Sequence, residues 1–326
     1  MQEIQKYVNG LKPGKVQSYR NMALVPLMGK DSKLDYLVFD EAINSGLHVS
    51  ETGSVPTLHF ANNTEKEVLI IQGEYVLGGK QNRMVSRNAY MAENFDGEVP
   101  VNCVQQHRWT SGAPRSFGTS HKRAPRSLCF AASIGQREVW SEVNYLHAGL
   151  GVRSSTENLD DAYDQKQSEL SDYLNNFEYT PGAVGVVAVI QNQGKKVYAA
   201  DIFDQGDTSE KYFNKMVESY ALEAATGGGD IKKPTKKEIG GFLKSLKDCK
   251  FQEQKPISLG RDYIIRGSKV QGSALLYDGT NVYVTFSTKP ERIPQGPRSG
   301  RRRRPGRIGP GRLDSPFGTG FSRHIF

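Results

Sequence analysis

Long apolar runs are absent from this chain. Its 326 residues contain no window of 18 or more consecutive apolar residues, and the mean hydropathy is −0.56. A membrane-spanning helix needs about 20 mainly apolar residues, so we expect no membrane partner. The first residues, Met1 to Lys6, also lack the apolar core of a signal peptide. Together with three cysteines that give no disulfide framework, these absences favour a reducing, cytoplasmic location.

Cysteine and metal-binding patterns are also scarce. Cys103, Cys129 and Cys249 are far apart and odd in number, so they give neither a disulfide framework nor a CxxC pair. The six histidines form no HxH, HxxxH or HExxH spacing. The glycines 227–229 end a predicted helix and are not followed by GK[ST], which excludes a phosphate loop. We therefore expect no metal site and no cofactor.

Excess positive charge is absent from most of the chain, although the whole sequence carries +8. Residues 291–326 contain nine Arg and two acidic residues, or +7, which leaves 34 basic and 33 acidic side chains, or +1, in the other 290 residues. This Gly-, Pro- and Arg-rich tail is expected to be disordered in isolation. Its arginines could contact nucleic acid by counterion release, or could simply extend the chain.

Short apolar runs separated by turns dominate the first part of the sequence. Val55–Phe60, Val68–Ile71 and Val99–Gln105 are typical of strands, and a polar strand is expected from Glu74 to about Tyr90. This pattern predicts a β-sandwich or jelly-roll-like core over residues 16–110. The polar, basic segment 110–136 is rich in Gly, Ser and Pro, which predicts a long exposed loop.

Helices and strands mix in residues 137–290 without a regular βαβ alternation. The spacing of apolar residues predicts helices over Leu159–Phe177, Thr208–Ala225 and Glu238–Leu246. Strands are expected over Ala183–Ile190, Lys195–Phe203, Asp262–Ile265, Ser273–Tyr277 and Asn281–Ser287. The sequence therefore predicts an α+β fold, with one domain over residues 1–290 and the tail beyond it.

Two polar segments interrupt this apolar pattern. Both are rich in side chains that bind phosphates, polar edges or aromatic rings, namely Lys80, Gln81, Asn82 and Arg83 in the first, and Gln105, Arg108 and Trp109 in the second. Arginine and lysine neutralise phosphate, amides recognise polar edges, and an indole ring stacks on a base. A phosphorylated, aromatic ligand such as a nucleotide would use all of these groups.

The same residues have a structural interpretation. They could form a polar network that joins two strands and a loop, with Arg83 or Arg108 buried against Glu74. Glu74 could act as a general acid or base, but a salt bridge is the more common role for a single carboxylate. Cys103 lies in an apolar strand context, near Val101 and Val104, and is expected to pack in the core.

The two segments together resemble the ARPP-1 family, the "ARG and rhodanese-phosphatase-superfamily-associated protein domain". The resemblance rests on the segments 79–83 and 103–109 and covers about residues 15–290. No reaction is established for the family, but its association with ADP-ribosylglycohydrolases and rhodanese-type phosphatases implies a role near ADP-ribose or phosphate esters. The family usually has glutamate where this chain has Gln105. Since an amide does not transfer protons at neutral pH, this difference favours binding over catalysis.

Three hypotheses follow from the sequence. The first is a binding module for a nucleotide-like, ADP-ribose-related ligand. It assigns phosphate contacts to Lys80, Arg83 and Arg108, polar-edge recognition to Gln81, Asn82 and Gln105, and stacking to Trp109. The second is a hydrolase or transferase acting on an ADP-ribosyl or phosphoester substrate, with Glu74 as acid or base. The third is a protein-interaction scaffold without a small ligand.

Overall fold

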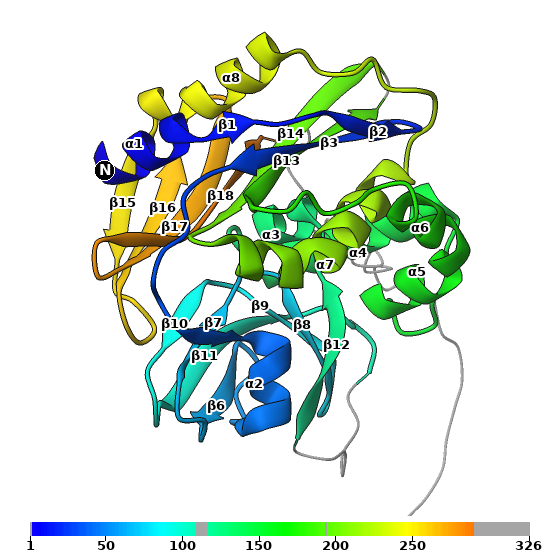
Figure 1. Cartoon of the computed structure of the whole chain (residues 1–326). Coiled ribbons are helices and arrows are strands. Elements are labelled where there is room, and N and C mark those ends of the chain that lie inside the picture. The colour runs from blue at the N-terminus through cyan, green and yellow to red at the C-terminus, as the bar shows by residue number, and fades with distance from the viewer. Residues whose placement is uncertain (1, 109–115, 193, 290–326) are drawn as a thin grey trace, which may run out of the picture. The chain divides into compact units, whose positions relative to one another are not determined.

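Three β-sheets and a layer of helices form the folded part of the chain. The computed structural model describes residues 2–108, 116–192 and 194–289, and in these ranges it contains eight α-helices and 18 strands (Figure 1). The α+β class predicted from the sequence is therefore confirmed. All described residues belong to a single unit. The basic tail, for which disorder was predicted, lies outside the described residues.

The largest sheet has nine strands and combines the two ends of the described chain. Its strand order is β1-β3-β13-β14-β18-β17-β16-β15, with β2 paired to β3, and every pairing is antiparallel. The strands are β1 (Lys12–Pro13), β2 (Gln17–Tyr19), β3 (Met22–Met28), β13 (Ala183–Asn192), β14 (Lys195–Phe203), β15 (Lys250–Gln254), β16 (Arg261–Arg266), β17 (Val270–Tyr277) and β18 (Thr280–Thr288).

Both faces of this sheet are covered, which explains the continuous apolar run in β13. Helices α1 (Gln2–Gly10) and α8 (Lys236–Lys244) cover one face, and α7 (Gly206–Ala224) covers the other (Figure 1). Val187 and Val189 pack in the apolar core with α1 and α8, whereas Val186 and Ala188 pack in the core with α7. A strand that is buried on both faces has no polar face to expose. Helix α8 begins at a capping box formed by Thr235 and Glu238.

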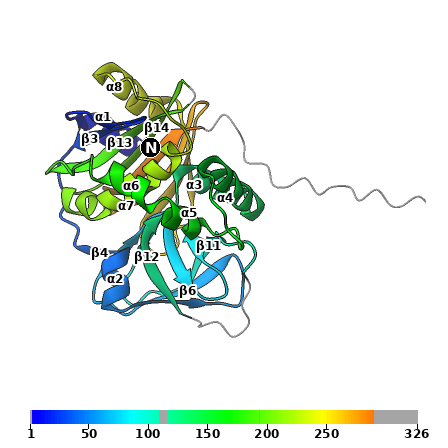
Figure 2. The same ribbon diagram turned by 90° about the vertical axis from the view of Figure 1, so that its right-hand side faces the viewer.

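Shorter helices lie beside α7 on the same face of the sheet (Figure 2). They are α3 (Arg126–Ala132), α4 (Gln136–Leu150), α5 (Leu159–Gln165) and α6 (Gln167–Leu174), and a 3-10 turn, η1 (Ser245–Asp248), follows α8. The single helix predicted over 159–177 is thus two helices that meet near Lys166. Helix α4 was not predicted.

A second β-rich region lies beyond this helical layer. Its six-stranded sheet has the order β12-β8-β9-β11-β6-β5, and its three-stranded sheet has the order β10-β7-β4. The strands are β4 (Tyr36–Val38), β5 (Leu47–Glu51), β6 (Thr57–Asn62), β7 (Glu67–Ile70), β8 (Glu74–Gly78), β9 (Arg83–Val85), β10 (Ala89–Met91), β11 (Asp96–Cys103) and β12 (Phe117–Arg123). Helix α2 (Phe39–Ser45) packs against them around a separate apolar core.

Two predicted boundaries are wrong. The exposed loop predicted over 110–136 contains β12 and α3, and its basic residues Arg123 and Arg126 are buried. These residues turn inward because a buried carboxylate from the large sheet binds them, which the local sequence does not reveal. The β-rich core predicted over 16–110 also begins too early. Strands β2 and β3 belong to the nine-stranded sheet and not to the second β-rich region.

Candidate functional site

The first polar segment forms a tight turn between β8 and β9, and not part of one long strand over 74–90 as predicted. Gly78 and Gly79 have φ angles of 129° and 52°, which glycine adopts at little cost. A Cβ atom at residue 79 would lie 2.2 Å from Cζ of Phe117 and 2.5 Å from Oε1 of Glu51. The backbone N–H of Lys80 donates to the same Glu51 oxygen at 2.8 Å. The turn therefore requires glycine at 79.

Gln105 connects the two polar segments. Its Oε1 accepts a hydrogen bond from Nε of Arg108 at 2.6 Å and from the backbone N–H of Asn82 at 3.4 Å. Its Nε2 donates to Oγ1 of Thr156 at 3.0 Å, and its backbone carbonyl accepts from Nε2 of Gln81 at 2.9 Å. The segments that the sequence singled out thus meet, through contacts that satisfy the amide of Gln105.

Asn82 is similarly engaged. Its Oδ1 accepts from Nη2 of Arg108 at 3.0 Å and from the backbone N–H of Gly78 at 3.2 Å. Its Nδ2 donates at 3.1 Å to Oδ1 of Asn158, which also accepts from the hydroxyl of Tyr75 at 3.1 Å. Asn158 also caps the N-terminus of α5, and its part in the network was not predicted. The residues Gln81, Asn82 and Gln105 are 5%, 7% and 6% exposed, so this network is nearly sealed from solvent.

Arg83 differs from its neighbours because much of its hydrogen-bonding capacity is unused. The side chain is 0% exposed, and Nη1 donates to Oε1 of Gln81 at 3.3 Å. Neither Nε nor Nη2 has an acceptor among the described residues. Burial lowers the pKa of Arg83, the groups at Cys103 and Glu51 raise it, and the charge of Arg108 lowers it again. The cation is therefore buried without an ion-paired carboxylate from the described part of the chain.

Glu74 lies apart from this network. It is 0% exposed, and its Oε2 accepts from Nζ of Lys215 on α7 at 2.9 Å. Lys215 also contacts Oδ1 of Asp40 at 2.7 Å, and these two carboxylates keep its pKa raised despite burial. Within the described ranges, no hydrogen bond or ion pair joins Glu74 to Arg83 or Arg108. The salt-bridge role of Glu74 is thus the one that the geometry shows.

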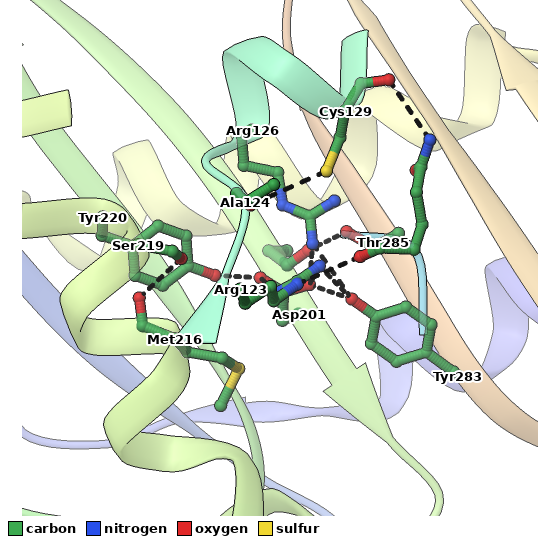
Figure 3. A network of polar contacts seen from close by, with 12 residues as sticks. Arg123, Ala124, Arg126, Cys129, Asp201, Met216, Ser219, Tyr220, Tyr283 and Thr285 are labelled. Carbon is green, nitrogen blue, oxygen red and sulfur yellow. Dashed lines mark hydrogen bonds and ion pairs between the residues drawn. The ribbon is translucent and has the colours of Figure 1, made fainter. Parts of the chain in front are cut away.

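A second buried network surrounds Asp201 on β14 (Figure 3). Arg123 binds both carboxylate oxygens, with two contacts of 3.1 Å, and Arg126 binds Oδ1. The hydroxyls of Tyr220 and Tyr283 also donate to this carboxylate. The network joins β12, α3, β14, α7 and β18. It was not predicted, because its acid lies far along the chain from both arginines.

The remaining predicted site residues are placed as follows. The Lys80 side chain is half-buried, and Trp109 lies outside the described residues.

No group of three or more His, Cys, Asp or Glu side chains in the described ranges is arranged to hold a metal ion. Among the helices over residues 2–289, leaving out 109–115 and 193, none combines the length and the apolar character needed to span a membrane. Cys103 is fully buried, as predicted.

Comparison with known proteins identifies the family. The chain matches the ARPP-1 family, "ARG and Rhodanese-Phosphatase-superfamily-associated Protein domain", over residues 10–287. Since the match spans most of the sequence, the chain belongs to the ARPP-1 family. No curated protein and no solved structure matches it.

Proposed function

We propose that this ARPP-1 protein binds an anionic, nucleotide-like ligand of the ADP-ribose class, and that Arg83 and Arg108 anchor its phosphates. The buried guanidinium of Arg83 carries the proposal, because two of its nitrogens have no acceptor among the described residues. A buried charge without a partner is costly, and a bound phosphate would supply both the opposite charge and the missing acceptors.

Gln105 strengthens this argument. A glutamate at this position, as the family resemblance leads us to expect, would place a carboxylate 2.6 Å from Nε of Arg108. It would then act as an internal counter-ion for Arg108 and, through the shared network, for Arg83. With glutamine at this position, the positive charges of the two arginines have no internal counter-ion from residue 105. An anion from outside the chain can therefore take the place of the missing carboxylate.

The other hypotheses receive less support from the geometry. An enzyme that uses Glu74 would need a carboxylate that is free to act on the substrate, but Glu74 is already paired with Lys215. Arg83 is equally buried, but two of its nitrogens have no acceptor among the described residues. A scaffold without a ligand agrees with the satisfied amides of Asn82 and Gln105. It gives no reason for a buried arginine of which two nitrogens, Nε and Nη2, lack acceptors among the described residues, and this difference separates the scaffold hypothesis from the binding proposal.

Isothermal titration calorimetry with ADP-ribose and NAD tests the proposal. Wild-type protein should bind ADP-ribose, and Arg83→Met should weaken binding at least about tenfold, because a hydrogen-bonded charge contact is lost. Arg137→Met serves as a matched control, since Arg137 is a surface residue of α4 whose side chain is 69% exposed. The proposal fails if the wild type binds neither ligand, or if the two variants bind equally well.

Two further assignments belong to this proposal. We place the protein in the cytoplasm, where its three free cysteines would remain reduced. Nucleic acid is the other candidate partner, through the basic tail alone, because the near-neutral charge of the remaining chain offers no comparable electrostatic attraction.

A further inference from the structure

A cavity with several charged and amide side chains in its lining lies away from the Arg83 network, where the two β-rich regions meet. It has a volume of about 320 Å³ and is bounded by residues 86–88 after β9, by α3, and by β16–β18. Arg83, Gln105 and Arg108 do not line it. At about 30 Å³ for each water molecule, this volume corresponds to roughly ten waters. The cavity is therefore large enough for a small ligand but not for a protein segment.

Positive charge dominates the lining of this cavity. It contains three arginines, Arg87, Arg126 and Arg266, and one acid, Asp262, so the formal balance is 3 − 1 = +2. Cys129 adds no negative charge, because burial raises the pKa of its thiol to about 12. A concave surface with excess charge of one sign attracts a ligand of the opposite sign.

The three guanidinium groups differ in what already binds them. Arg87 contacts Oδ2 of Asp262 through Nη2 at 2.7 Å and Nε at 3.3 Å, so it is held in place. Arg126 reaches Asp201, a carboxylate that it shares with Arg123 (Figure 3). Asp201 is thus the carboxylate that contacts both arginines in the described chain. Glu223 also interacts with Arg126, but burial raises the pKa of this second carboxyl group.

Arg266 completes the set. It is exposed at the end of β16 and forms no ion pair with any residue that the structure describes. Three arginines therefore border the same cavity. Arg87 is paired with Asp262, Arg126 shares Asp201 with Arg123, and Arg266 has no acidic partner in the described chain. Guanidinium groups bind carboxylate and phosphate oxygens alike through paired N–H donors. The excess positive charge of the lining is what favours a doubly charged phosphate over a singly charged carboxylate.

We propose that this cavity binds a small phosphate monoester of a polyol, such as a sugar phosphate. The phosphate would lie against Arg126 and Arg266. Gln72, Asn88, Ser133 and Ser273 also line the cavity. Nε2 of Gln72 already donates to the carbonyl of Cys129 and Nδ2 of Asn88 to Oγ of Ser273. The groups left for sugar hydroxyls are therefore Oε1 of Gln72 as an acceptor and the hydroxyl of Ser273 as a donor. The site is separate from the one proposed for the nucleotide-like ligand, and it shares no residue with it.

Calorimetry at low ionic strength tests this site with ribose 5-phosphate, inorganic phosphate and uncharged ribose. Ribose 5-phosphate should bind most tightly and ribose should give no heat. Arg266→Gln should weaken binding of ribose 5-phosphate at least about tenfold. Arg261→Gln is the matched control: it removes the same charge from the same strand, but Arg261 faces Glu253 at 3.0 Å and does not line the cavity.

Each result decides the proposal. Absence of binding by the wild type, or equal affinities of Arg266→Gln and Arg261→Gln, overturns it. Binding of ribose as tight as that of ribose 5-phosphate overturns the phosphate assignment. The Arg83→Met variant separates the two proposals, because it should keep its affinity for ribose 5-phosphate even if it no longer binds ADP-ribose. Since Arg266 is exposed and has no ion pair within the described ranges, its replacement leaves the fold intact.

Discussion

Arg83 lies opposite Cys103 in the antiparallel pairing of β9 with β11, and both side chains are fully buried. The thiol of Cys103 donates to the backbone carbonyl of Gln105 at 3.0 Å. Burial raises its pKa, and the neighbouring Arg83 and Arg108 lower it by less. A neutral thiol therefore faces the buried cation. The pairing joins the two segments of the sequence motif but leaves the charge of Arg83 without compensation.

Replacing Arg83 with an apolar side chain of similar length should stabilise the free protein. Arg83→Met removes a buried charge that has no carboxylate partner in the described chain, and substitutions of buried ionic groups by apolar ones are neutral or stabilising by up to about 4 kcal/mol. Urea unfolding without ligand measures this change. The scaffold hypothesis predicts the opposite, a large loss of stability, so a strong decrease would contradict the binding proposal. Arg137→Met should change stability by less than about 0.5 kcal/mol.

Gln105→Glu tests whether the internal counter-ion and the ligand compete. The new carboxylate would accept from Arg108 and from the hydroxyl of Thr156, and charged hydrogen bonds of this kind stabilise by about 1.5–3 kcal/mol. We expect the free energy of unfolding to rise by about this amount and the affinity for ADP-ribose to fall. Both are measurable on one variant, by urea unfolding and calorimetry. Gln106→Glu adds the same charge one residue away and should do neither. Unchanged stability of Gln105→Glu would contradict the counter-ion argument.

Much of the fold could be predicted because its elements carry strong local signals. The run Ala183–Ile190 and the return strand to Phe203 are confirmed as β13 and β14, and the helix predicted over 208–225 is α7. The segment 117–132 could not be predicted in this way. Its strand and helix are stabilised by contacts of Arg123 and Arg126 with Asp201. Asp201 lies far along the chain from both arginines, so no local sequence pattern indicates these contacts.

The candidate site was predictable in part. Gln81, Asn82, Arg83, Gln105 and Arg108 meet in one network, although the two polar segments that contain them lie about twenty residues apart in the sequence. What the sequence could not reveal is the depth at which they lie. Polar side chains of this kind are mostly exposed, whereas here Arg108 is half-buried and the other four are buried. Glu74 lies apart from this network because it pairs with Lys215 on α7. The position of Lys215 depends on how α7 packs, which the sequence does not reveal.

Asp201 should be among the residues on which stability depends most. Asp201→Asn would leave Arg123 and Arg126 buried without their shared carboxylate, which costs about 3–5 kcal/mol in comparable cases. We expect a correspondingly lower midpoint of urea unfolding. Asp207→Asn is a suitable control, since Asp207 is 68% exposed and pairs with Lys211 on the surface. Equal stability of the two variants would show that the network in Figure 3 is not what holds these elements together.

Any binding of RNA should depend on the tail. Deletion of residues 291–326 removes nine Arg and lowers the formal charge from +8 to +1. Affinity for a polyanion falls with salt in proportion to the number of phosphates neutralised, so the full chain should bind single-stranded RNA more weakly at about 200 mM than at about 50 mM salt. Fluorescence anisotropy of labelled RNA measures this. A deletion variant that still binds RNA with the same salt dependence would assign binding to the folded part.

The cluster of Asp40, Glu74 and Lys215 should produce two pH effects of opposite sign. Burial raises the pKa of Asp40, but the charge of Lys215 and hydrogen bonds from Lys215, Thr119 and His121 outweigh it, so the pKa lies below its ordinary value. The stabilisation due to Asp40 is therefore complete above the unfolded pKa of about 3.9 and is lost as the pH falls through the folded pKa. The difference in unfolding free energy between wild type and Asp40→Asn should shrink during acidification below about pH 4.

Glu74 should behave in the opposite way. Burial raises its pKa more than the charge of Lys215 lowers it. The folded state then binds a proton more tightly than the unfolded state, so this contribution is complete below about pH 4.3 and is lost as the pH rises through the folded pKa. The stability of wild type relative to Glu74→Gln should thus increase as the pH falls from neutral toward that value. Urea unfolding of both variants from about pH 3 to about pH 8 distinguishes the two trends. Trends of the same sign would mean that Lys215 compensates both carboxylates equally.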